Sequence, residues 1–99
     1  MIVANEHLVN GKKLVAVCDK VLLGKKFEEG GLQLDLSGSF YKGNEVSGEE
    51  LENLLKGAYF VNFVGKGSVG FGIKKGLVGK GRVIKVKGVL HAQAMMEGF

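Results

Sequence analysis

A glycine-rich segment of the chain has the spacing of a dinucleotide-binding turn. Residues 65–70 read Gly-Lys-Gly-Ser-Val-Gly, which matches G-x-G-x-x-G. The apolar run at 58–64 predicts a strand before this turn, and Ser68 to Lys75 predicts a short helix after it. The fingerprint also requires an acid about 20 residues further on, but that region is basic, with Lys85 and Lys87. We therefore interpret the turn as a packing feature, whose helix amides are still able to hold one phosphate.

His91 and Gln93 lie on one face of a predicted strand from Val89 to Met96. They could contact a base edge or take part in acid–base chemistry, because histidine titrates near neutral pH. The competing interpretation is a structural histidine at a strand end. Asn62 and Gly65 belong to the same candidate polar site. A small ligand-binding domain or enzyme centred on His91, Gln93 and Asn62 would need a concave pocket where these three side chains converge.

Other catalytic and metal chemistries have little support. The single cysteine, Cys18, excludes an intrachain disulfide and a multi-cysteine metal site, and it suits a reducing cytoplasm. A lone cysteine at a strand end is usually a small buried apolar residue. The two histidines lack the acid or cysteine spacing of a metal site, and Asp19 and Asp35 could be paired only by the fold. We therefore assign no catalytic residue, metal or cofactor and lean against an enzyme.

The charge of the chain is divided unevenly between its two halves. Residues 1–52 hold six lysines and nine acids, net −3, whereas residues 53–99 hold seven lysines, one arginine and one acid, net +7. A basic half favours contact with a polyanion, most often a phosphate backbone, although a solvated lysine surface is the alternative. The candidate phosphate contacts are Lys66, Lys74, Lys75, Lys80, Arg82, Lys85 and Lys87.

Aromatic residues could add stacking on bases. Phe40 and Tyr41 lie in a polar segment and are the better candidates. Phe60 and Phe63 belong to the apolar run at 58–64, so we expect them in the core.

The first half of the chain predicts a hairpin, a strand and a helix. Asn10-Gly11 between two apolar-rich runs indicates a type I′ turn that pairs His7 with Leu14 and Asn5 with Ala16. Asp19 to Leu23 predicts one helical turn, 27–31 a turn-bearing link, 32–36 a half-buried strand and 37–44 a loop or ragged hairpin. Ser47 and Glu50 have the spacing of a capping box before a packing helix that Gly57 ends.

The second half predicts strands at 58–64, 82–87 and 89–96 around one helix. Strands at both ends of the chain with two helices between them favour an α+β fold in one domain, residues 1–99. We expect a two-layer sandwich: one mixed, mostly antiparallel sheet with two helices on one face.

Several segments together resemble a small archaeal family, the domain of unknown function four-two-four. They are Val15-Ala16-Val17-Cys18-Asp19, Leu23-Gly24-Lys25, Asn62-Phe63-Val64-Gly65, Gly76-Leu77-Val78 and Gly88-Val89-Leu90-His91-Ala92-Gln93. The resemblance covers nearly the whole chain and implies a two-layer α+β domain of this length. It implies at most a predicted RNA-binding or translation-associated role, and no activity.

Three hypotheses about partners follow from the sequence. The first is a cytoplasmic module that binds RNA or the ribosome through the basic half. The second is the small-ligand domain or enzyme described above. The third is a homodimer formed through a terminal strand, because a chain without proline leaves its edge strands unprotected. No apolar run reaches the roughly 18 residues of a membrane span, so we expect no membrane partner.

Overall fold

A six-stranded mixed sheet is the centre of the computed structural model, which describes residues 1–96. Its strands stand in the order β5-β1-β2-β6-β8-β7. The first three come from the first half of the chain and the last three from the second half. Their bounds are β1 Ile2–Val9, β2 Lys12–Asp19, β5 Asn44–Val46, β6 Ala58–Val64, β7 Ile84–Val86 and β8 Val89–Met95. β2 and β6 are parallel, and every other neighbouring pair is antiparallel.

The β1–β2 hairpin has the predicted turn and register. Asn10 and Gly11 have φ values of 51° and 77°, as a type I′ turn requires at both central positions. His7 lies opposite Leu14 and Asn5 opposite Ala16, which confirms the predicted pairing.

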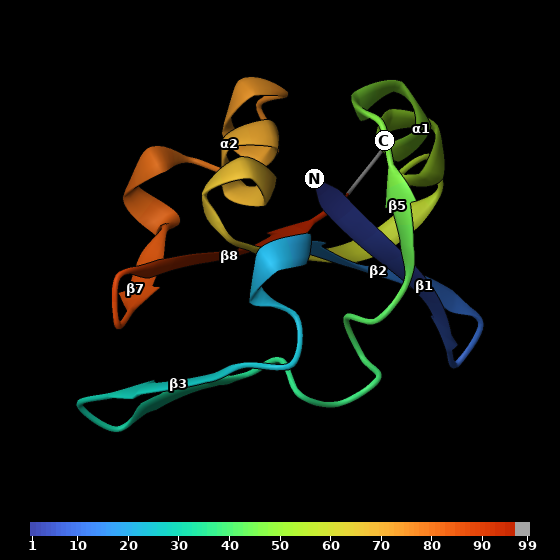
Figure 1. Ribbon diagram of the computed structural model, residues 1–99. Helices are drawn as coiled ribbons and strands as arrows, with labels where there is room; N and C mark the ends of the chain where they lie inside the picture. The colour runs from blue at the N-terminus through green and yellow to red at the C-terminus, as the bar shows by residue number, and fades with distance from the viewer. Residues whose placement is uncertain (97–99) are drawn as a thin grey trace.

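Two α-helices cover one face of the sheet, as predicted (Figure 1). α1, Gly48–Leu54, begins at the expected capping box: the Ser47 hydroxyl accepts from the Glu50 amide at 3.1 Å, and the Glu50 carboxylate accepts from the Ser47 amide at 2.9 Å. α2, Lys66–Lys74, begins two residues earlier than predicted. Between helices and sheet lies a core that includes the buried side chains Val17, Leu51, Leu55, Val61, Phe63 and Val69.

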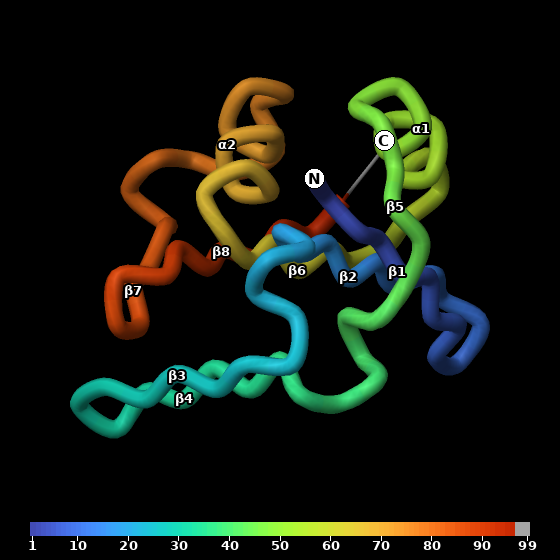
Figure 2. Tube along the Cα trace, in the orientation of Figure 1, coloured from blue at the N-terminus to red at the C-terminus, as the bar shows by residue number. Residues whose placement is uncertain are grey.

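A two-stranded sheet on the opposite face was not predicted. It is the hairpin of β3, Lys26–Glu29, and β4, Leu32–Asp35, which projects below β7 (Figures 1 and 2). The expectation of a link at 27–31 was wrong. β3 has one apolar side chain, the half-buried Phe27, between charged residues, so its sequence does not show the alternation of apolar and polar residues that indicates a strand. A second core lies under this hairpin and the loop after it, and includes Ala16, Cys18, Leu34, Leu36, Tyr41 and Val64.

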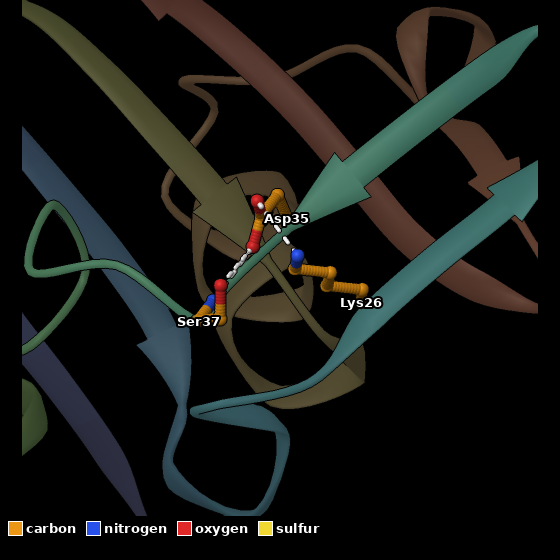
Figure 3. A network of polar contacts seen from close by, with 3 residues as sticks. All are labelled: Lys26, Asp35 and Ser37. Carbon is orange, nitrogen blue, oxygen red and sulfur yellow. Dashed lines mark hydrogen bonds and ion pairs between the residues drawn. The ribbon is translucent and has the colours of Figure 1, made fainter.

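Polar contacts hold the end of this hairpin (Figure 3). Asp35 Oδ1 accepts from the amide of Ser37 at 2.9 Å and from its hydroxyl at 2.5 Å. Lys26 Nζ lies 4.0 Å from Asp35 Oδ2. The hydrogen bond from the Ser37 hydroxyl has the largest effect on the pKa of Asp35 and, with the bond from the Ser37 amide, lowers that pKa below its ordinary value.

The chain also forms two short 3-10 turns. η1, Lys20–Leu22, is the helical turn expected before Gly24, and η2, Lys80–Arg82, precedes β7. No helix within residues 1–96 has the length and apolar character needed to cross a membrane.

Candidate nucleic-acid interface

The amino end of α2 is already occupied by a carboxylate of the chain. Asp19, the last residue of β2, accepts from the amides of Gly67 at 2.9 Å and Ser68 at 2.8 Å, and from the Ser68 hydroxyl at 2.7 Å. These are the helix amides that, from the sequence alone, we expected to be able to hold a phosphate. Because Asp19 satisfies them, the glycine-rich turn is a structural joint between β2 and α2 and not an open anion site.

The glycines of this turn make room for that carboxylate. Gly65 has φ +105°, and a Cβ there would stand 2.4 Å from Asp19 Cγ. A Cβ on Gly67 would lie 3.2 Å from Asp19 Oδ1. Gly72 lets α2 approach the sheet, since a Cβ there would lie 3.2 Å from the Phe63 ring of β6 and 3.0 Å from Val78 in the loop after α2. Close approach therefore explains the G-x-G spacing without a nucleotide, and Gly65 contributes backbone geometry to the site.

The structure brings Asn62 and Gln93 together and places His91 beside them. The two amides face each other on adjacent strands, and Gln93 Nε2 donates to Asn62 Oδ1 at 2.9 Å. His91 is two residues before Gln93 on the same face of β8. Asn62 is 7% exposed, whereas Gln93 is exposed. Asn62 therefore orients Gln93.

His91 is not fully satisfied by its surroundings. Its Nε2 is buried and has no hydrogen-bond partner among residues 1–96. Burial lowers the pKa of His91 below its ordinary value of 6.5, so the ring is held in its neutral form. A buried ring nitrogen without a partner costs stability, and it marks this position as a candidate for ligand contact.

A cavity of about 660 Å³ adjoins His91 and Gln93 at the outer side of β8. Arg82 from η2, Ile84 from β7 and Phe60 from β6 contribute to its lining. Asn62 does not line it, so the pocket expected around three converging side chains is built from His91, Gln93 and Arg82 instead. Sequence reasoning placed Arg82 only among the phosphate contacts, because nothing in the pattern shows that η2 folds back over β8.

All seven predicted phosphate contacts are exposed and lie in or next to α2, η2 and β7. α2 packs over the central strands β2, β6 and β8, whereas β7 is the edge strand of the sheet. α2, η2 and β7 occupy the same side of the molecule in Figure 1. Lys66 and Lys85 also line one cavity of about 450 Å³ beside the α2 amino end.

One of the seven is paired with an acid from the first half of the chain. Lys75 Nζ lies 2.9 Å from Glu52 Oε2. The backbone amide of Lys87 donates to Glu29 Oε1 at 2.9 Å, which brings a carboxylate close to that residue. The other six side chains have no ion pair within the described part of the chain. We set Lys87 apart because of the nearby Glu29 carboxylate and name the remaining five the basic edge: Lys66, Lys74, Lys80, Arg82 and Lys85.

The aromatic candidates divide differently from the expectation. Tyr41 is only 7% exposed and packs in the second core, so it is not available for stacking. Phe40 is 39% exposed, and its ring stacks on His7 with centroids 4.6 Å apart. Phe63 is buried as expected, whereas Phe60 is half-buried and lines the cavity beside β8.

The remaining candidate groups, Cys18, Asp19 and Asp35, are buried or engaged in hydrogen bonds with the chain. Cys18 is fully buried, and desolvation, with a smaller contribution from Asp19, raises the pKa of its thiol to about 12. Asp19 and Asp35 bind different serines and do not act as a pair.

Comparison with known proteins agrees with this fold. The family described as "Protein of unknown function (DUF424)" matches residues 7–96. The chain belongs to the DUF424 family. A crystal structure of an uncharacterized conserved protein from Methanopyrus kandleri is similar to this DUF424 protein, with a TM-score of 0.77 and 22% identity over 99% of this chain and 96% of that one. At that identity the likeness shows the shared fold alone. None of the curated proteins has a significant match to the chain.

Proposed function

We propose that this DUF424 protein binds RNA, free or within the ribosome, through the phosphates that meet its basic edge. The observation that carries the proposal is that five cations on α2, η2 and β7 lack an ion pair within residues 1–96. Cations without protein partners are available to replace the counterions of a nucleic acid, and the released counterions drive binding. The lysine-rich composition suits backbone contact more than base-specific readout.

The salt dependence of affinity tests this function. A fluorescently labelled single-stranded RNA should bind at low salt. If all five cations contact phosphates, affinity should fall about 100-fold between 50 and 200 mM salt, because each contact contributes a log–log slope of about −0.7. The absence of binding at low salt, or a flat response to salt, would contradict the proposal.

A pair of double variants separates the basic edge from general positive charge. Lys80→Gln with Lys85→Gln should lower affinity and reduce the magnitude of the slope by about 1.4, the share of two contacts. Lys25→Gln with Lys42→Gln is the matched control, since both lysines are exposed, lie in the first half and have no ion pair within residues 1–96. Equal losses in both variants would show that net charge alone determines binding.

A small-ligand site is the second candidate function, and the cavity beside β8 favours it. Its volume of about 660 Å³ is in the range of ligand pockets, and Asn62 fixes the amide of Gln93 at its wall. Nucleosides and nucleoside monophosphates are suitable probes because the lining combines apolar surface with Arg82. A rise in the melting temperature with such a probe, abolished by Gln93→Met, would support this function.

A further inference from the structure

The cavity beside β8 combines apolar walls with polar groups that lack partners. Phe60, Ile84 and Met95 supply apolar surface. Gln93 donates to Asn62 through Nε2, which leaves its Oε1 free to accept a hydrogen bond. His91 Nε2 and the Arg82 guanidinium have no polar partner among residues 1–96. A ligand that fills this cavity therefore needs apolar surface together with hydrogen-bonding groups.

The cavity is continuous in the fold with the basic edge. Arg82 belongs to both, and Lys80 and Lys85 stand on the η2 and β7 elements that flank the cavity. RNA-binding proteins commonly recognise unpaired bases, which they stack on aromatic or guanidinium groups and hydrogen-bond along the exposed edge. The lining of this cavity contains groups of both kinds: Phe60 and Arg82 for stacking, and Gln93 and His91 for hydrogen bonds.

We propose that this cavity binds an unpaired base of an RNA strand whose phosphates contact the basic edge. The inference rests on the proposed function and narrows it to single-stranded or looped RNA. A free Gln93 Oε1 accepts from an exocyclic amino group, so adenine, cytosine and guanine are preferred over uracil, which lacks one. The neutral His91 ring contributes one further donor or acceptor.

A strand from a second copy is the competing occupant. β7 pairs only with Val89–His91, so the outer edge of β8 is open from Ala92 to Met95. The Leu90 carbonyl and the Met96 amide form hydrogen bonds on the β6 side of β8. Because backbone groups alternate in direction along a strand, the amides and carbonyls of Gln93 and Met95 point away from β6, toward the open edge. This free edge is only four residues long, however, and two-fold pairing there would bring two Arg82 guanidinium groups into one interface. These features favour the base.

The test compares a single-stranded RNA with a fully paired RNA duplex of the same length. The wild-type protein should bind the single strand at least about tenfold more tightly, and Gln93→Met should remove about tenfold of that affinity, as the loss of one hydrogen bond predicts. Gln93→Met should leave duplex affinity and the salt slope unchanged. Gln33→Met, at an exposed glutamine of β4, is the matched control.

The outcomes separate this inference from the proposed function. Binding of single strand and duplex with equal affinity, unaffected by Gln93→Met, would overturn the base pocket and leave phosphate contact standing, whereas no binding at all would overturn both. A wild-type dimer at assay concentration that Gln93→Met dissociates would assign the cavity to a second copy. If Gln93→Met fails to fold, photocrosslinking of wild-type protein to RNA containing 8-azidoadenosine decides the matter. The crosslink should map to Phe60, His91 or Met95, and a crosslink elsewhere overturns the inference.

Discussion

The carboxylate of Asp19 should be the largest single polar contribution to the stability of this fold. Asp19→Ala removes three hydrogen bonds, two of them from amides in the first turn of α2. Ser68 is fully buried, so water cannot replace the partner that its amide and hydroxyl lose. Loss of a helix cap costs about 0.5–2 kcal/mol, the lost charge at the helix amino end about 0.3–1 kcal/mol, and a buried unsatisfied donor about 1–3 kcal/mol.

We therefore expect Asp19→Ala to lower the free energy of unfolding by about 3 kcal/mol. For a chain of this size that corresponds to a fall in melting temperature of roughly 12–24 °C. Asp19→Asn keeps one carbonyl oxygen and should cost about half as much. Urea unfolding followed by circular dichroism measures the change, and an unaltered denaturant slope would show that the unfolded state is not affected.

Asp35→Ala is the matched control for this prediction. Asp35 also accepts from the amide and hydroxyl of one serine, Ser37, but all of these groups are exposed (Figure 3). Water can take the place of the carboxylate there, so the effect should be much smaller. If Asp19→Ala changed stability by less than about 0.5 kcal/mol, the ordinary range of surface substitutions, the closed joint between β2 and α2 would be refuted.

Three further predictions concern packing and titration. Gly70→Ala should stabilise the protein by about 1 kcal/mol in urea unfolding, because a Cβ there meets nothing within 4 Å, whereas Gly72→Ala should destabilise it by contact with Val78. Burial lowers the pKa of His91, so as the pH falls through about 6.5 the unfolded chain binds a proton at this residue before the folded protein does. The free energy of unfolding should therefore decrease below that pH. Urea titrations at pH 7.5 and 5.5 should show this decrease, and it should be smaller in His91→Gln. The Cys18 thiol, with its pKa raised to about 12, should not react with iodoacetamide at pH 8 until urea unfolds the protein, and rapid alkylation of the native state would contradict its burial.

The elements that were predicted best depend on neighbouring residues. Asn10-Gly11 determines its turn and register by the backbone angles that the two residues accept. Ser47 and Glu50 form a helix start that is complete within four positions. β5 was missed because it is only three residues long and has one half-buried side chain, so no alternation marks it.

The candidate site was predictable only in its residues. Asn62 and Gln93 lie opposite each other and are hydrogen-bonded, but Asn62 does not line the cavity, which depends on where β7 ends and on the position of η2. The role of Asp19 was missed because its hydrogen bond to Ser68 depends on the parallel pairing of β2 with β6. These two strands are far apart in the sequence, and no local sequence pattern indicates that they are neighbours. An aspartate at the end of one strand, together with a glycine turn after another, was the available signal.

The arrangement of the sheet has a consequence for how the chain assembles. The seam between β2 and β6 separates the sheet strands of the acidic first half from those of the basic second half. α2, which packs on β2, and the β3–β4 hairpin, which contacts β7, also cross it. Closing the seam requires the long excursion from Lys20 to Gly57 to lose its freedom, which makes it the slow, entropy-limited event of folding. Opposite net charges draw the halves together during that search, so dissolved salt weakens the attraction that guides their docking.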